Sequence, residues 1–245
     1  MPTRVVPDGP EGRRAAIEVL RAGGIVAIPT DTVYGIAIAL DAQDGVARLF
    51  EAKRRPPDRA IMLLIDDARQ AGEVGMMGPA ALALAAAGWP GGLTLVLPRR
   101  PGVALPAALT GGAPTIGVRL PDHPAPRALA RGVGPLPTTS ANLASQPAAT
   151  TADQVVDQLG DVVDLVLDGG PAPGGTASTV VDCSDDRPRL IRAGAISPGT
   201  LASVLDAAGL AHDLPHDLPP GAPGEGSGAV PGRPPGPTQR SSTPG

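Results

Sequence analysis

The chain is poor in cysteine, histidine, aromatic residues and positive charge. Its single cysteine, Cys183, excludes an intramolecular disulfide framework, and with three histidines we expect no metal held by protein nitrogen or sulfur. Its aromatic residues, Tyr34, Phe50 and Trp89, are too few to form a platform for stacking bases. A formal net charge of −4 argues against a broadly basic nucleic-acid-binding protein, so we expect any RNA contact to be local or weak.

Long apolar runs are also missing. No stretch approaches the roughly 18 uncharged apolar residues that a membrane span requires, and the N-terminus lacks the apolar segment of a secretory signal. We therefore expect a cytoplasmic protein without a membrane partner. With 42% apolar and 18% charged residues over 245 positions, the composition is that of a globular chain with a sizeable core.

Proline and glycine are concentrated at the C-terminal end. From about Asp213 onward these two residue types dominate, and no hydrophobic period survives. Such a segment cannot bury enough apolar surface to offset its ordering entropy, so we expect it to be disordered. The sequence therefore predicts a working domain over residues 1–210 and a Pro/Gly-rich tail over 211–245.

Short apolar runs alternate with stretches of helical periodicity in the working domain. The apolar runs are mostly continuous, which indicates a sheet covered on both faces, and some follow one another too closely for crossovers. We therefore predict an α/β fold with a mixed sheet. The expected strands are 24–30, 34–40, 60–66, 93–98, 115–121, 164–169, 178–183 and 189–193. The expected helices are 11–24, 42–55, 79–88, 125–132, 151–160 and 197–209.

Four residues that occur once each fall in short polar or glycine-rich segments, namely Lys53, Asn142, Tyr34 and Trp89. Such segments, at strand or helix ends, are where α/β folds place ligand sites. Lys53 and Arg55 follow a predicted helix, and either they offset the helix dipole or they hold a polyphosphate through an ammonium and a guanidinium. No standard glycine-rich phosphate loop occurs, so a bound nucleotide would not be held by one.

Hydroxyl and amide side chains are clustered at Thr138, Thr139, Ser140 and Asn142. They suit an ordinary turn, but they also offer a neutral cradle for a phosphate or a ribose. Arg119 and Arg192 lie inside apolar strands, where an arginine usually pairs with a carboxylate, either of the protein or of a substrate.

Two other reactive residue types have ordinary explanations. His123 precedes a proline at a predicted helix start, which favours a turn or cap residue over a general base. Cys183 follows two β-branched residues with no histidine nearby, which favours a small strand residue over a nucleophile.

Seven segments occur in a characteristic order: PTDTVYG, K-x-R at Lys53, WPGGLT, TIGVRLPDHP, SANLAS, STVVD and LIRAG. In this order the chain resembles the YrdC-like threonylcarbamoyl-AMP synthases over about residues 10–205. The resemblance implies a twisted open α/β sheet with a concave, positively charged cavity. It also implies a reaction that joins L-threonine, bicarbonate or CO2, and ATP, with Mg²⁺ on the phosphates, into threonylcarbamoyl-AMP and pyrophosphate. The product would reach proteins that transfer the threonylcarbamoyl group to adenosine 37 of tRNA.

The resemblance also implies roles for individual residues. Residues expected to bind ATP are Lys53, Arg55, Thr115, Ser140, Asn142 and Arg192. Residues expected to bind L-threonine are Thr32, Arg119, Thr138 and Ser178. The expected catalytic set is the paired signature of Lys53, Arg55, Ser140 and Asn142. In one departure from the family pattern, Ala148 stands where some members have a serine that contacts ATP.

The implied chemistry needs no dedicated general base, because a carbamate is itself a nucleophile once the amine has lost its proton. Cations must bring the anionic carbamate and ATP together, so catalysis would rest on positioning and electrostatics. Two alternatives remain open. The chain could be a non-catalytic RNA-binding module with a cationic cavity, or a carbamoyl transferase domain like that of hydrogenase maturation proteins, which are fused to further domains.

Overall fold

The structure, a computed structural model, describes residues 3–54 and 61–218. In these ranges the strands are β1 (Arg4–Pro7), β2 (Val26–Ile28), β3 (Gly35–Ala37), β4 (Met62–Leu64), β5 (Leu93–Pro98), β6 (Thr115–Arg119), β7 (Leu136–Ser140), β8 (Leu165–Asp168), β9 (Thr179–Asp182) and β10 (Arg189–Arg192). The helices are α1 (Pro10–Arg21), α2 (Gly45–Ala52), α3 (Ala68–Val74), α4 (Pro79–Gly88), α5 (Ala107–Thr110), α6 (Pro124–Val133), α7 (Ala152–Leu159) and α8 (Pro198–Ala207).

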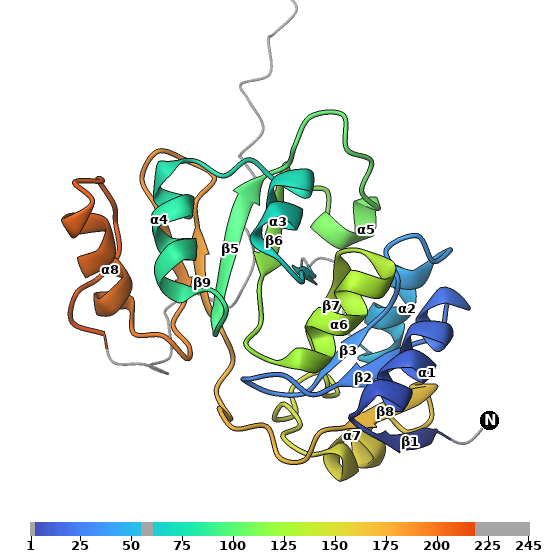
Figure 1. Cartoon of the computed structure of the whole chain (residues 1–245). Helices are drawn as coiled ribbons and strands as arrows, with labels where there is room; N and C mark the ends of the chain where they lie inside the picture. The colour runs from blue at the N-terminus through green and yellow to red at the C-terminus, as the bar shows by residue number, and fades with distance from the viewer. Residues whose placement is uncertain (1–2, 55–60, 219–245) are drawn as a thin grey trace, which may run out of the picture.

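The strands form one mixed sheet in the order β1-β8-β2-β3-β7-β4-β6-β5-β9-β10 (Figure 1). Parallel pairs are β1/β8, β2/β8, β4/β6 and β5/β9, and the remaining neighbours are antiparallel. The predicted α/β fold with a mixed sheet is therefore confirmed. The segment 169–178 connects β8 near one edge to β9 near the other, so it crosses the width of the sheet.

Apolar side chains pack on both faces of this sheet, as the continuous apolar strands predicted. Successive residues alternate between two clusters: Ile36 and Leu63 belong to the larger cluster, and Ala37 and Leu64 to the smaller one. Helices α2, α4, α7 and α8 contribute buried residues to the larger cluster, and α1 and α6 to the smaller one. Burial of both faces holds the strand ends in fixed positions, where the polar segments emerge.

Every strand and helix expected from the sequence is present. Most are shorter than expected, β5 and α4 have the expected bounds, and α6 is longer by one residue at each end. The sequence patterns did not indicate β1, β7, α3 and α5. Strand β1 is a short edge strand with exposed residues, and β7 contains a proline and two threonines, so neither has a continuous apolar pattern. Helices α3 and α5 are only 7 and 4 residues long, too short for a clear helical period.

The chain after α8 remains in contact with the domain for several residues. Leu214 is buried in the larger apolar cluster, and Asp213 pairs with Arg187 at 2.5 Å. Most of the expected tail, residues 219–245, lies outside the described residues. No described helix has the length and apolar character needed to span a membrane.

Candidate active site

An open cavity of about 220 Å³ lies where the 30–35 loop, β4, β6, β7 and the 177–178 segment meet. Its polar lining consists of Thr30, Thr32, Tyr34, Arg119, Thr138, Thr139, Ser140, Asn142, Ser178 and Arg192. Its apolar lining consists of Val33, Gly35, Ile61, Met62, Leu64, Ala148 and Ala177. The described lining thus contains hydroxyls, an amide and two guanidinium groups but no carboxylate, which suits an anionic ligand.

Lys53 follows the last residue of α2 and is buried. Its ammonium donates hydrogen bonds to the Ser140 carbonyl, to Ser140 Oγ at 3.2 Å and to Asn142 Oδ1 at 2.9 Å. It thus contacts residues 87 and 89 positions away, which favours the ligand-site interpretation over the helix-dipole one. Ser140 and Asn142 line the cavity and Lys53 lies behind them. Arg55, expected beside Lys53, lies outside the described residues.

The loop that follows β7 is fixed by its own hydrogen bonds. Ser140 Oγ donates to Asn142 Oδ1 at 2.6 Å, and Asn142 Nδ2 donates to the carbonyls of Leu143 and Gln146 at 2.9 and 2.8 Å. The Ala144 N–H donates to the Lys53 carbonyl at 3.0 Å, which joins this loop to the end of α2 a second time. The amide and hydroxyl that face the cavity are therefore held in place before any ligand binds.

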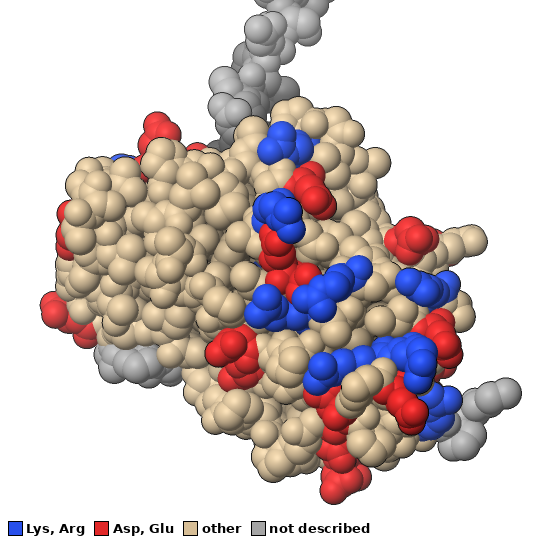
Figure 2. Space-filling view, viewed as in Figure 1, with Lys and Arg blue, Asp and Glu red and all other residues tan. Residues whose placement is uncertain are grey.

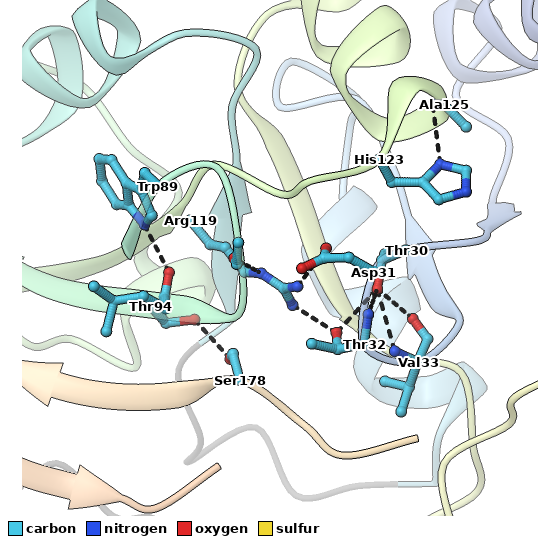
Figure 3. A network of polar contacts seen from close by, with 12 residues as sticks. Thr30, Asp31, Thr32, Val33, Trp89, Thr94, Arg119, His123, Ala125 and Ser178 are labelled. Carbon is cyan, nitrogen blue, oxygen red and sulfur yellow. Dashed lines mark hydrogen bonds and ion pairs between the residues drawn. The ribbon is translucent and has the colours of Figure 1, made fainter. Parts of the chain in front are cut away.

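Arg119, at the end of β6, is buried beside the cavity (Figure 3). Its Nη2 donates to Asp31 Oδ1 at 2.6 Å, its Nη1 to Thr32 Oγ1 at 2.8 Å, and its Nε to the Gly91 carbonyl at 3.0 Å. Burial lowers the pKa of Arg119, and the charge of Asp31 opposes this effect. The sequence left open whether Arg119 pairs with a carboxylate of the protein or of a substrate. The structure shows that it pairs with a carboxylate of the protein, Asp31.

The loop that brings Asp31 and Thr32 to Arg119 is a compact turn centred on Thr30. Thr30 Oγ1 accepts from the N–H groups of Thr32 and Val33 at 3.1 and 3.2 Å, and it donates to the Val33 carbonyl at 2.6 Å. Gly174 of the crossing segment lies against this turn, since a Cβ there would come 2.6 Å from the Asp31 carbonyl. The sequence showed the polar turn but not that Asp31 pairs with Arg119.

Arg192 and Ser178 form another part of the cavity lining. The Arg192 guanidinium donates to the Ser178 carbonyl at 2.8 Å and to Ser178 Oγ at 3.2 Å, and Ser178 Oγ shares a hydrogen bond with Thr94 at 2.8 Å. Partial burial, followed by the nearby charge of Arg119, lowers the pKa of Arg192. Among the described residues, no carboxylate forms an ion pair with Arg192, so its charge is available to a ligand. A Cβ at Gly194 would lie 2.3 Å from the Ala177 carbonyl, so this approach requires glycine.

Of the remaining residues that the sequence singled out, some line the cavity and others do not. Thr138 lines the cavity, and its hydroxyl donates to the Leu136 carbonyl at 2.8 Å. Thr115 does not line the cavity, because it begins β6 whereas Arg119 ends it, and four residues of strand span about 13 Å. Trp89 also lies outside the lining: its Nε1 donates to the Leu93 carbonyl at 2.7 Å, and its ring packs on the apolar core.

His123 and Cys183 have the ordinary roles that their sequence context predicted. His123 Nδ1 accepts the Ala125 N–H at 3.1 Å, so His123 is the N-cap of α6. Cys183 is buried beside Asp182, and burial first and then this charge raise the pKa of its thiol to about 12. Neither residue lines the cavity.

One group of possible metal ligands occurs among the described residues, formed by Asp206 in α8 and by His212 and His216 after it. His212 Nδ1 accepts the Leu214 N–H at 3.1 Å, so a neutral His212 has its proton on Nε2, which lies 3.1 Å from Asp206 Oδ1. A metal ion at Nε2 would have to displace that proton. The arrangement therefore suits a hydrogen-bonded histidine–aspartate pair better than a metal site.

The fold and the cavity together define an α/β protein with a preformed pocket for an anionic ligand. The chain belongs to the Sua5/YciO/YrdC family, whose model, described as telomere recombination, matches residues 18–194. It is 40% identical over 194 residues to the threonylcarbamoyl-AMP synthase of Bacillus subtilis, covering 78% of this chain and 55% of that protein. It is 38% identical over 199 residues to a putative threonylcarbamoyl-AMP synthase of Mycobacterium tuberculosis, covering 80% of this chain and 91% of that protein.

Solved structures of the family have the same fold. Pyrococcus abyssi Sua5 complexed with L-threonine matches with a TM-score of 0.78 and 32% identity, covering 86% of this chain and 62% of that one. Escherichia coli YciO matches with a TM-score of 0.69 and 27% identity, covering 78% of this chain and 95% of that one. The chain therefore spans just over half of the longer relatives and most of the shorter ones.

Proposed function

We propose that this protein is a threonylcarbamoyl-AMP synthase. The observation that supports this most is the convergence of Lys53 with Ser140 and Asn142 beside a cavity that also contains Arg119 and Arg192. Its relatives are named for this activity, and one was solved with L-threonine. The enzyme would be a nucleotidyltransferase, since it would transfer AMP from ATP to a carbamate.

L-Threonine would bind at the Arg119 end of the cavity. Arg119 would hold its carboxylate, because a guanidinium offers paired donors that match a carboxylate. The hydroxyls of Thr32, Thr138 and Ser178 would contact the remaining polar groups of the amino acid. The small, partly apolar hollow beside them, with Met62 and Ile61, suits a short side chain with one methyl group.

ATP would bind next to the threonine, on the side of Arg192, Ser140 and Asn142. Arg192 and the ammonium of Lys53 would attract the phosphates, and Arg55 is expected to join them. The cavity of about 220 Å³ is smaller than the about 300–1,000 Å³ typical of larger ligands, so the nucleotide would extend beyond its mouth. Thr115, although expected to contact ATP, would do so only outside the described cavity.

The proposed reaction forms one carbon–nitrogen bond and one phosphorus–oxygen bond. The threonine amine loses a proton and attacks CO2 to give a carbamate. A carbamate oxygen then attacks the α-phosphorus of ATP, the bond to the bridging oxygen breaks, and pyrophosphate leaves. Lys53 and Arg192 would offset the repulsion between the two anions and stabilise the charge on the leaving group.

Mg²⁺ would arrive with ATP rather than bind to the protein. The described lining contains no carboxylate, the group through which proteins usually hold Mg²⁺, and its hydroxyl and amide oxygens would bind the ion only together with phosphates. The ion would therefore be coordinated by phosphate oxygens, where it would neutralise part of their charge.

Pyrophosphate release, measured with each amino acid in turn and with or without bicarbonate, tests this proposal. We expect release only when L-threonine and bicarbonate are both present. Release with another amino acid, or none under any condition, would refute it. Because threonylcarbamoyl-AMP is a labile mixed anhydride, we also propose that tRNA threonylcarbamoyl-transfer proteins consume it, with at most a weak contact between this chain and tRNA.

The alternative of a non-catalytic RNA-binding module has less support. Figure 2 shows basic groups beside acidic ones on this face. Among the described residues, such ion pairs include Arg131–Asp66 at 2.7 Å and Arg13–Asp8 at 2.6 Å. Paired surface charges attract phosphates weakly. Salt-dependent RNA affinity without pyrophosphate release would favour this alternative.

A further inference from the structure

The guanidinium of Arg119 has only part of its hydrogen-bonding capacity left for a ligand. An arginine has five N–H donors. In Arg119, Nε is used by the Gly91 carbonyl, one Nη1 donor by Thr32 Oγ1 and one Nη2 donor by Asp31 Oδ1. One donor on each terminal nitrogen remains. These two donors can bind a carboxylate only if the guanidinium plane is held in one orientation.

Asp31 provides the closest contact that fixes this orientation. Its Oδ1 lies 2.6 Å from Nη2, and only 4% of the Arg119 side chain and 15% of the Asp31 side chain are exposed. Asp31 itself does not line the cavity. Figure 3 shows Asp31 and Thr32 of the same turn both directed at the guanidinium.

The turn makes Asp31 a rigid support. Thr30 Oγ1 accepts hydrogen bonds from the N–H groups of the two residues that follow Asp31, and Gly174 packs against the Asp31 carbonyl. The Asp31 backbone is therefore held in place, which limits how far its carboxylate can follow a rotated guanidinium. Asp31 also balances the charge of Arg119, whereas Arg192 forms no ion pair with a carboxylate among the described residues.

We propose that Asp31 is a positioning residue for the amino-acid substrate, which orients Arg119 toward the threonine carboxylate without touching the substrate. This inference rests on the proposed function, because it assigns Arg119 to the amino acid. It implies that loss of Asp31 weakens the use of L-threonine much more than the use of ATP.

The test compares the variants D31A and D31N with a matched control, D8N. Asp8 forms an equally short ion pair with Arg13, at 2.6 Å, with 10% of its side chain exposed, and it lies outside the cavity lining. Steady-state pyrophosphate release gives kcat and the KM values for L-threonine and ATP, and thermal unfolding reports whether each variant is folded.

We expect D31A to raise the KM for L-threonine by about tenfold, as the loss of one charged hydrogen bond predicts, while kcat and the KM for ATP stay within about twofold. D31N keeps an oxygen that can accept the Arg119 N–H, so its KM for L-threonine should stay within about threefold of the wild type. D8N should leave all three parameters unchanged.

Equal changes in the threonine and ATP parameters, or D31N as impaired as D31A, would overturn the proposal. Loss of the folded state in both variants would also overturn it, because the pair would then be structural. If the wild-type protein shows no threonine-dependent release, the proposed function fails and this inference with it. If the wild type is active and D31A resembles D8N, only this inference fails.

Discussion

Tyr34→Phe tests how the crossing segment is attached to the sheet. Tyr34 is fully buried, and its hydroxyl donates to the Gly170 carbonyl at 2.7 Å and accepts the Gly169 N–H at 3.1 Å. The substitution removes only this hydroxyl and leaves two backbone groups without their partner. At about 1 kcal/mol for each hydrogen bond, we expect a loss of about 2 kcal/mol in the free energy of unfolding.

This loss should appear as a lower melting temperature. In a domain of this size, 1 kcal/mol corresponds to about 2–4 °C, so calorimetry should show a decrease of about 4–8 °C. Circular dichroism at 25 °C serves as the control and should be unchanged, because the ring still fills its place. A melting temperature within about 1 °C of the wild type would refute the view that these two bonds hold the segment.

The pH dependence of the same difference gives a second check. Burial is the main cause that raises the pKa of Tyr34 from 10.0 to about 12. A phenol whose pKa is higher in the folded state favours folding while it is protonated. The advantage of the wild type over Tyr34→Phe should therefore be constant below pH 10 and should decline as the pH rises toward 12. A difference that changes between pH 6 and 9 would contradict this assignment.

Two further predictions concern the cavity and the single thiol. Lys53→Ala and Asn142→Ala should each lower threonine- and bicarbonate-dependent ATP consumption by about 100-fold or more without loss of the fold, and wild-type rates in either variant would remove that residue from the site. Cys183, buried and with a pKa of about 12, should resist iodoacetamide at pH 8 in the native protein and react after unfolding. Rapid labelling of native protein would contradict its position.

Local sequence patterns predicted most of the fold. Apolar runs of strand length and helical periods are properties of neighbouring residues, so the expected elements are all present. The missed strand β7 shows where this reasoning stops. It lies in the middle of the sheet between β3 and β4, and its Thr138 and Thr139 are buried because neighbouring strands surround them, not because they are apolar.

The sequence likewise predicted some residues of the candidate site but not the contacts between them. Rarity and sequence context singled out Lys53 and Asn142, and in the structure Lys53 Nζ lies 2.9 Å from Asn142 Oδ1. The same signal misled for Trp89, which packs on the core. The position of Arg119 inside an apolar strand predicted a carboxylate partner. No local pattern could identify that partner as Asp31, because the two residues are 88 positions apart and only the folded chain brings them together.

The sequence by itself determined the order and type of most elements, the polar segments at their ends and the lack of an intramolecular disulfide, because each depends on residue type and short-range spacing. Only the tertiary structure decided which segments meet. Strand order and register join residues far apart in the chain, and they place Lys53 against Ser140, Asp31 against Arg119 and Ser178 against Arg192, with Thr115 left at the far end of its strand.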